Sequence, residues 1–152
     1  MTAESIVLLA ALLLILGRLA AEFRLARLNE RHVLAHADHV PEPFRNMIDP
    51  PTYTRAVEYT LAKSRFSRVE DIYQTGILIA FLFSGILPWS HQLLVEHWGL
   101  SAWIQAAWLV AVGVALSLPS LPFEWVAQFR LEERFGFNTT TPKLWWTDRF
   151  KG

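Results

Sequence analysis

Residues 72–95 read IYQTGILIAFLFSGILPWSHQLLV, and residues 98–123 read WGLSAWIQAAWLVAVGVALSLPSLPF. These blocks of 24 and 26 residues contain no Lys, Arg, Asp or Glu. About 20 helical residues cross a hydrocarbon core roughly 30 Å thick, so each block is long enough to span a membrane. The alternative is a pair of buried core helices. A chain of 152 residues is too short to wrap two fully apolar helices in protein, which favours the membrane.

A third apolar block lies at the N-terminus and is weaker. Residues 5–17 are uncharged. The block reaches spanning length, over about 5–21, if Arg18 extends its side chain to the membrane interface. A secretory signal peptide is the alternative, and such peptides begin with positive charge. The chain instead begins Met-Thr-Ala-Glu-Ser, which has one acidic residue and no basic one, so we expect a retained first span.

The composition agrees with a membrane protein. Hydrophobic residues make up 53% of the chain and charged residues 18%, against about 25% charged in soluble domains. The 14 basic residues are balanced by 14 acidic ones, which disfavours nucleic acid as a partner, and the absence of Cys excludes thiolate chemistry. We predict an all-α fold, a polytopic membrane helical bundle that forms a single transmembrane domain over residues 1–152. The predicted transmembrane helices are three, at about 5–21, 72–95 and 101–118. The lipid bilayer is the expected partner of this domain.

The positions of the cations predict the topology. Nine of the 14 Lys and Arg residues lie between Arg18 and Arg68, and the other five follow residue 129. The short turn at 96–99 contains none of them. Cytoplasmic loops carry an excess of Lys and Arg. We therefore expect an integral membrane protein with its N-terminus outside and with the loop 22–71 and the tail 124–152 in the cytoplasm.

The loop 22–71 is expected to be helical rather than flexible. Asp49 is suited to cap a helix that has Pro50 at its first position. Tyr53, Val57 and Leu61 follow at intervals of four residues and would form an apolar stripe. Such an amphipathic helix either lies on lipid or packs against protein, and its mixed charges favour packing.

Proline and glycine predict where the helices bend or end. Pro88 removes a backbone donor and should kink the second span near Ser84 and Gly85. Pro119 and Pro122 should end or kink the third span after about residue 118. Gly136 is suited to a left-handed helix end, and Thr141-Pro142 to the start of a further amphipathic helix.

We find no catalytic, cofactor-binding or metal-binding residues by motif. The chain lacks H-E-x-x-H, the phosphate-binding G-x-x-x-x-G-K-[ST] and the nucleophile elbow G-x-S-x-G. His32, His36 and His39 have spacings that allow three imidazoles to ligate zinc from one helix face. His39 directly precedes Val40-Pro41, where the helix should end, so a solvated basic loop is the favoured interpretation.

Two groups of strings, one in the first loop and one in the tail, resemble the CAAX prenyl protease type 1 family of membrane-embedded zinc metallopeptidases. The loop strings, which resemble those of bacterial homologues, are Arg31-His32-Val33, His36, Val40-Pro41, Ala56-Val57-Glu58-Tyr59-Thr60-Leu61-Ala62-Lys63 and Arg65-Phe66. The tail strings are Phe123-Glu124, Leu131-Glu132-Glu133-Arg134-Phe135-Gly136-Phe137-Asn138, Thr140-Thr141 and Lys143. The resemblance covers nearly the whole chain and keeps the order of span, loop, span, turn, span and tail.

The resemblance implies the N-terminal part of a peptidase whose helices enclose a chamber. The likeness to bacterial homologues implies that its membrane is the bacterial inner membrane. In that family zinc is held by H-E-x-x-H and a distant Glu, and these residues follow everything present here. We therefore expect a chamber-wall segment that is truncated before the catalytic motif and inactive alone. Zinc and peptide substrate would be bound only in the complete enzyme, in which the remaining C-terminal spans and the metal domain are this segment's partners. A stand-alone three-span scaffold or assembly protein is the alternative.

Overall fold

A computed structural model describes residues 2–151, and every regular element in them is helical. The all-α prediction is confirmed. The elements are α1 (Ala3–Ala35), η1 (Glu42–Phe44), α2 (Pro50–Phe83), α3 (Ile86–Trp98), α4 (Ala102–Ser117), η2 (Leu118–Ser120), α5 (Leu121–Val126), the π-helical η3 (Ala127–Glu132), α6 (Glu133–Phe135) and α7 (Pro142–Lys151).

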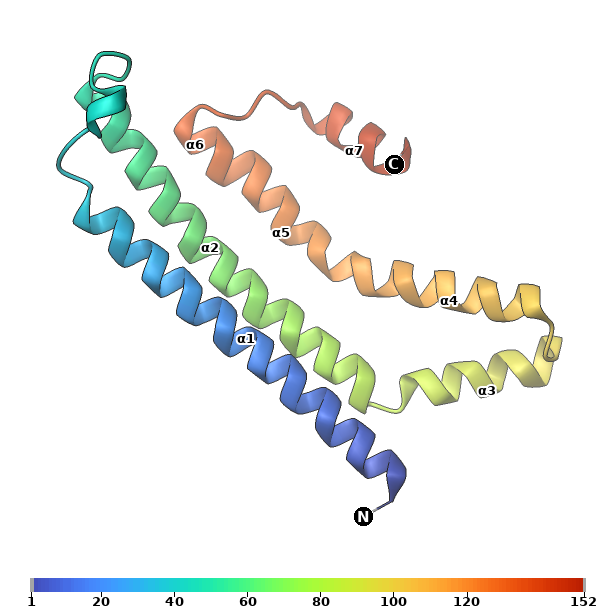
Figure 1. Cartoon of the computed structure of the whole chain (residues 1–152). Coiled ribbons are helices and arrows are strands. Elements are labelled where there is room, and N and C mark those ends of the chain that lie inside the picture. Colours follow the sequence, from blue (N-terminus) through green and yellow to red (C-terminus); the bar gives the residue numbers. More distant parts are fainter. Residues whose placement is uncertain (1, 152) are drawn as a thin grey trace.

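The long helices form one layer (Figure 1). Helices α1 and α2 lie side by side and antiparallel, and the segment from η2 to α6 returns along the other side of α2. The hairpin of α3 and α4 points away from this layer, and α7 folds back towards α5. Helix α2 is therefore the central element, with α1 on one side and the tail on the other.

Two helices are long and apolar enough to cross a membrane by themselves. They are α1 and the continuous helix Ala102–Phe135, and α2 with α3 makes a third candidate, bent by 50°. The chain therefore contains membrane helices, as the composition indicated. The limits of the three predicted spans stay predictions.

The predicted kink near Ser84 and Gly85 is a complete break in the helix. Gly85 has φ 78°, a left-handed conformation that costs glycine little and other residues more. Pro88 lies in the first turn of α3, where its missing N–H leaves no hydrogen bond unmade. At Pro119 and Pro122, by contrast, the helix only tightens into the short η2 and then continues as α5.

The expected helix ends are present. The Asp49 carboxylate accepts a hydrogen bond from the Thr52 backbone N–H at 3.3 Å. Hydrogen bonding by Thr52, through its side chain first and its backbone N–H second, lowers the pKa of Asp49 below its ordinary value of 3.8. At the last helix, the Leu144 N–H donates to Thr141 Oγ1 at 3.3 Å. Both contacts satisfy N–H groups that a helix leaves unpaired in its first turn.

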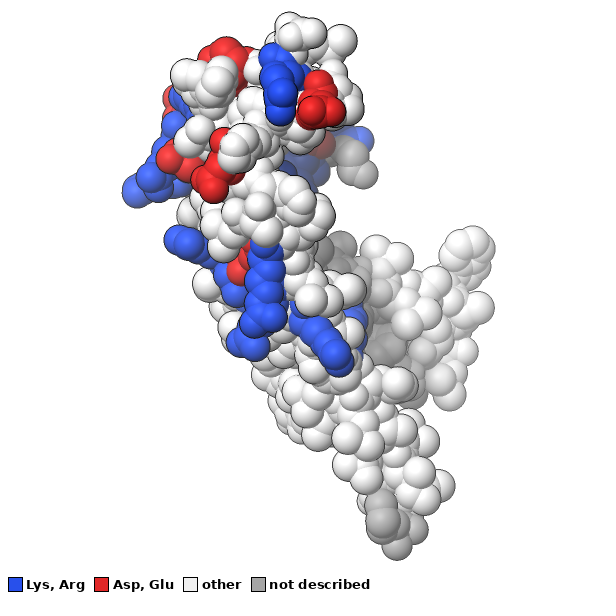
Figure 2. Space-filling view, turned by 60° about the vertical axis from the view of Figure 1, so that its left-hand side comes forward, with Lys and Arg blue, Asp and Glu red and all other residues white. Residues whose placement is uncertain are grey.

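The chain has almost no core of its own. In residues 2–151, only Val40 and Phe135 are buried apolar side chains, with 9% and 7% of their surface exposed. The accessible surface is 11461 Å², whereas a globular protein of 17.4 kDa exposes about 7,900 Å². One end of the molecule is free of charge on the face in Figure 2, and the Lys, Arg, Asp and Glu side chains gather towards the other. Lipid or further protein must cover this surface.

Helices α1 and α2 are joined by polar contacts in their charged half. Arg68 Nη2 donates to Glu30 Oε1 at 2.6 Å, and both side chains are partly buried. The Tyr53 hydroxyl donates to the His36 carbonyl at 2.8 Å. Val57 lines a hollow beside His32, Val33 and His36 at the end of α1, and Tyr53, Val57 and Leu61 are half-buried.

Candidate functional site

Several polar and aromatic contacts of the described residues lie where α2 meets the tail. Two stretches form this site: residues 55–73 of α2, and Glu132-Glu133-Arg134-Phe135-Gly136-Phe137-Asn138, named here the EERFGFN segment. Their nearest ends, residues 73 and 132, are 59 positions apart in sequence, and the return of the chain along α2 brings the two stretches together.

A three-member polar cluster joins the two stretches. The Tyr59 hydroxyl donates to Glu132 Oε1 at 2.6 Å. Lys63 Nζ donates to Tyr59 Oη at 3.1 Å and lies 3.6 Å from the same Glu132 oxygen. The hydrogen bond to Tyr59, together with the attraction to Glu132, raises the pKa of Lys63. A short bond from a neutral donor to a partly buried carboxylate is among the stronger hydrogen bonds in proteins.

Aromatic rings close around this cluster. Tyr59 makes edge-to-face contacts with Phe135 at 5.3 Å and Phe137 at 4.8 Å between ring centroids. Closer to the membrane, Phe123 packs between Phe66 at 5.8 Å and Tyr73 at 4.9 Å. Such pairs contribute about 0.5–1.5 kcal/mol each beyond the area they bury. The tail is thus held to α2 along several helical turns.

The shape of the EERFGFN segment follows from its glycine. Gly136 has φ 78°, and its N–H donates to the Glu133 carbonyl at 3.1 Å. The Phe137 N–H donates to the Glu132 carbonyl at 2.9 Å. This pair of bonds is a Schellman motif, which ends a helix and reverses the chain. The reversal brings Phe137 back onto Tyr59.

Asn138 completes the segment by fixing the chain after the turn. Its Oδ1 accepts from Gln128 Nε2 at 2.7 Å and from the Thr140 N–H at 2.9 Å. Its Nδ2 donates to Glu133 Oε2 at 2.8 Å. The Asn138 side chain therefore links η3 and α6 to the loop that leads to α7.

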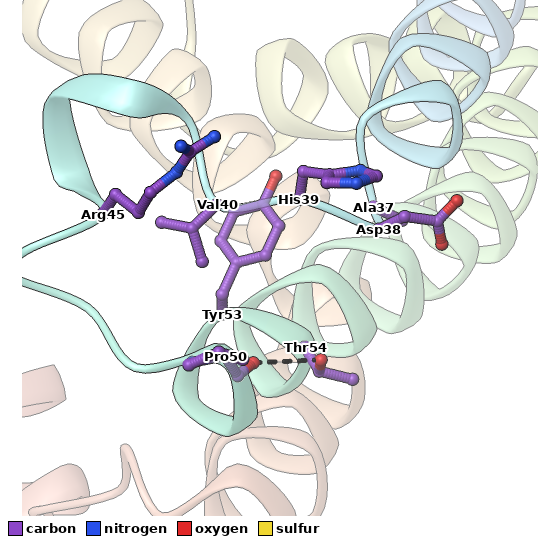
Figure 3. Close-up of a pocket in the computed structure, with 8 residues that line it drawn as sticks. All are labelled: Ala37, Asp38, His39, Val40, Arg45, Pro50, Tyr53 and Thr54. Carbon is purple, nitrogen blue, oxygen red and sulfur yellow. Dashed lines mark hydrogen bonds between the residues drawn. The ribbon is translucent and has the colours of Figure 1, made fainter.

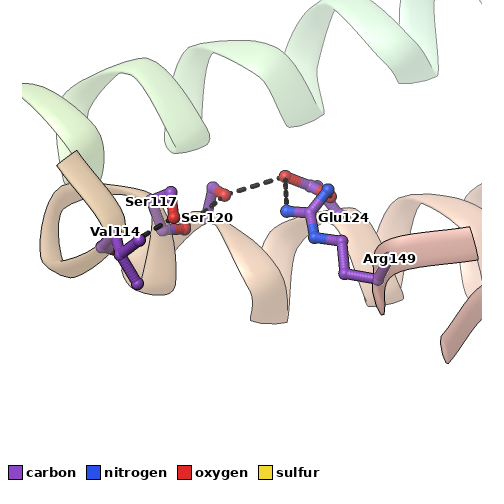
Figure 4. A network of polar contacts seen from close by, with 5 residues as sticks. All are labelled: Val114, Ser117, Ser120, Glu124 and Arg149. Atoms are coloured by element: carbon purple, nitrogen blue, oxygen red, sulfur yellow. Dashed lines mark hydrogen bonds and ion pairs between the residues drawn. The ribbon is translucent and has the colours of Figure 1, made fainter. Parts of the chain in front are cut away.

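A second network holds α7 against α5 (Figure 4). Arg149 contacts both carboxylate oxygens of Glu124, with Nη1 at 2.7 Å from Oε2 and Nη2 at 2.8 Å from Oε1. Ser120 Oγ lies 2.8 Å from both Glu124 Oε1 and the Ser117 carbonyl. Beside it, Leu121, Pro122, Trp125, Trp145 and Trp146 line an apolar hollow of about 500 Å³. The sequence alone did not indicate this pairing of Arg149 and Glu124.

The three candidate zinc ligands do not form a metal site. His36 Nδ1 lies 2.8 Å from the His32 carbonyl, and the two rings are 4.3 Å apart. His39 lies beyond the end of α1, beside Asp38, Arg45 and Tyr53, in a hollow of about 290 Å³ (Figure 3). Within residues 2–151, no group of three or more His, Asp or Glu side chains is arranged to hold a metal ion.

A third polar cluster connects α3 and α4 inside the charge-free region. His91 Nε2 lies 2.8 Å from Gln105 Oε1, and Trp108 Nε1 donates to Ser90 Oγ at 3.2 Å. The amide nitrogens of Gln105 and of Gln74 are buried without a hydrogen-bond partner among the described residues. Buried amide donors are normally satisfied.

Known proteins resemble the chain over most of its length. The family model described as CAAX prenyl protease N-terminal, five membrane helices, matches residues 29–152. CAAX prenyl protease 1 of Saccharomyces cerevisiae is 30% identical in an alignment 122 residues long, which covers 74% of this chain and 27% of that protein. The CAAX prenyl protease 1 homolog of Oryza sativa subsp. japonica is 28% identical in an alignment 120 residues long, which covers 74% of this chain and 28% of the relative.

A relative with wider coverage is the probable CAAX prenyl protease 1 of Schizosaccharomyces pombe. It is 25% identical in an alignment 149 residues long, which covers 90% of this chain and 31% of that protein. No solved structure matches the chain. The chain spans less than a third of the length of these curated relatives. The matched region contains α2 and the EERFGFN segment with their contacts, and on this evidence the chain belongs to the CAAX prenyl protease N-terminal family of membrane domains.

Proposed function

We propose that the chain forms part of the wall of an intramembrane chamber in a CAAX-prenyl-protease-like zinc metalloendopeptidase. The observation that carries this proposal is the single layer of long helices with only two buried apolar side chains in residues 2–151. A single layer of helices with so little core needs lipid or other protein against both of its faces. A wall that has lipid on one face and an enclosed space on the other, completed by the remaining C-terminal spans, would satisfy this requirement.

The wall segment is not catalytic alone in this proposal. A zinc peptidase needs protein ligands and a general base beside a metal-bound water. The described residues do not fit that requirement, because His39 does not join the neighbouring His32 and His36 in a three-ligand group and no other group of three ligands is present. Zinc and peptide cleavage would belong to the metal domain of a longer protein. The EERFGFN segment, held to α2 by Tyr59 and Glu132, would position that domain.

The proposed topology has the N-terminus outside and the loop 22–71 and tail 124–152 in the cytoplasm of a bacterium. The cation distribution supports the sidedness, and the likeness of the loop strings to bacterial homologues supports an inner membrane. The chain has no Cys, so single cysteines report position cleanly. We expect Ser67→Cys to resist an impermeant thiol reagent in whole cells and Glu96→Cys to react. The reverse pattern would overturn the topology.

A chimera tests the wall function. The first 27% or so of the Saccharomyces cerevisiae relative would be replaced by this chain, and cleavage of a CAAX peptide measured in membranes. We expect activity well above that of the relative truncated at the same point, and none from the chain alone. Membrane insertion and protease resistance serve as controls for folding. An inserted, folded and inactive chimera would argue for the stand-alone scaffold instead, and so would cleavage that is no higher than in the truncated relative.

A further inference from the structure

Three arginines form a stripe along the second half of α1. Arg24, Arg27 and Arg31 are spaced at i, i+3 and i+7, which places them on one face of a helix, and all three are exposed. Residues 2–151 provide no ion-pair partner for any of them within 4.0 Å. The stripe therefore carries three positive charges that the described chain does not neutralise.

The neighbouring acids are already engaged elsewhere. Glu22 is paired with Arg18 at 2.7 Å, and Glu30 with Arg68 at 2.6 Å. Their carboxylates are directed to those partners rather than to the stripe. In Figure 2, Lys and Arg side chains crowd the middle of the molecule, directly above its uncharged part.

The arginines are combined with apolar side chains in a hollow of about 470 Å³. Its lining consists of Ala20, Phe23, Arg24, Arg27, Leu28 and Arg31. Phe23 is half-buried, so part of its ring is packed and part faces the hollow. Cationic and apolar groups on one surface match a ligand that is itself amphipathic and anionic.

The end of the stripe nearest the first span lies at the level of the lipid headgroups. If the first span ends at about residue 21, Arg24 follows the hydrocarbon boundary by roughly 4–5 Å, Arg27 by about 9 Å and Arg31 by about 15 Å, since a helix rises 1.5 Å per residue. The long side chains of Arg27 and Arg31 can bring their guanidinium groups back towards the headgroups. The headgroup layer on each side of a bilayer is about 5–8 Å thick. Ala20 and Phe23 then lie at the boundary itself, where an acyl chain begins.

We propose that Arg24, Arg27 and Arg31 bind the phosphate of an anionic glycerophospholipid whose acyl chain lies along Ala20 and Phe23. Guanidinium groups bind phosphate through paired N–H donors, and basic segments next to a membrane helix attract anionic lipids. The proposed lipid-binding site lies on the exposed arginine face of α1 and is separate from the proposed role in a chamber wall. Lipid binding at this face does not depend on whether the chain is part of a protease.

Native mass spectrometry of the 152-residue chain in detergent tests the site, with phosphatidylglycerol and phosphatidylcholine of the same acyl composition as probes. We expect phosphatidylglycerol to bind at least about tenfold more tightly than phosphatidylcholine. The triple variant Arg24→Gln/Arg27→Gln/Arg31→Gln should lose this preference. The control Arg45→Gln/Arg65→Gln/Lys151→Gln, which removes the same charge from other places, should keep it.

Two further measurements keep the proposal falsifiable. The single variant Arg27→Gln, which changes one exposed side chain, should weaken phosphatidylglycerol binding by about fivefold even if the triple variant fails to insert. Inorganic phosphate at about 10 mM should not displace the lipid, because the acyl chain contributes to binding. The proposal would be overturned if both stripe variants kept the preference for phosphatidylglycerol, or if the control variant lost that preference equally. Displacement of the lipid by inorganic phosphate would also overturn it.

Discussion

The charged half and the membrane half of this chain are held together in different ways. In the charged half, Tyr59, Glu132 and Asn138 find partners within the chain at 2.6–2.9 Å. In the membrane half, the buried amide nitrogens of Gln74 and Gln105 have no partner in the described residues. The charged half is thus specified by internal contacts, whereas the membrane half is built to receive neighbours, whether lipid, water or further helices.

The largest expected effect comes from the turn that organises the charged half. Gly136→Val places a β-branched residue at φ 78°, a conformation that costs about 1–3 kcal/mol for non-glycine residues. The strain should also loosen Phe137 from Tyr59. We expect the thermal unfolding midpoint of the chain in detergent to fall by about 2–4 °C for each kcal/mol lost.

A second glycine provides the control for that variant. Gly113 lies within α4, and a Cβ added there meets no atom within 4 Å. Gly113→Ala should leave the free energy of unfolding within about 1 kcal/mol of the parent's, since alanine suits a helix better than glycine. Equal losses of stability from Gly136→Val and Gly113→Ala would mean that the left-handed turn at Gly136 has no particular stabilising role.

A pair of glutamine substitutions compares the two halves directly. Gln128→Leu removes the 2.7 Å hydrogen bond to Asn138 Oδ1, and we expect a loss of about 1 kcal/mol. Gln74→Leu removes a buried amide nitrogen that has no partner, so the isolated chain should be unchanged or slightly more stable. Thermal unfolding in one detergent measures both, and a larger loss from Gln74→Leu would reverse the comparison.

The smallest effect is a pH dependence at the start of α2. The hydrogen bond from Thr52 lowers the pKa of Asp49, so its stabilising contribution is complete above the ordinary value of 3.8 and is lost as the pH falls through the folded-state value. Asp49→Ala should therefore lower the unfolding midpoint at pH 6, and the difference from the parent should shrink below pH 4. Glu42→Ala, at an exposed carboxylate 4.0 Å from Arg45, is the control. If Asp49→Ala lowered the midpoint no more than Glu42→Ala does at pH 6, the cap at the start of α2 would have no stabilising role.

Much of the local structure could be predicted because its causes are local. Asp49-Pro50 starts a helix and Gly136 ends one, as the sequence indicated. The break at Ser84 and Gly85 was located correctly, but its extent was not predicted. Proline alone would only kink the helix, whereas the left-handed conformation of Gly85 interrupts it completely and turns α3 by 50°.

The candidate site was less predictable than the helices around it. The strings that resemble the protease family contain both Tyr59 and Glu132, yet nothing in either string shows that they pair across 73 residues. The same holds for Glu124 and Arg149, which pair across 25 residues. Such contacts depend on the path of the chain between the partners, which no short motif encodes.

The sequence by itself determined that this protein is helical, that it belongs in a membrane and that its Lys and Arg residues gather in the loop and the tail, because hydrogen bonding in lipid and the cost of burying charge act on each segment separately. Only the tertiary structure decided that α2 lies between α1 and the tail, and that the EERFGFN segment closes on Tyr59. Those choices depend on side chains far apart in sequence fitting one another at distances of a few ångströms, and that fit exists only once the helices are packed.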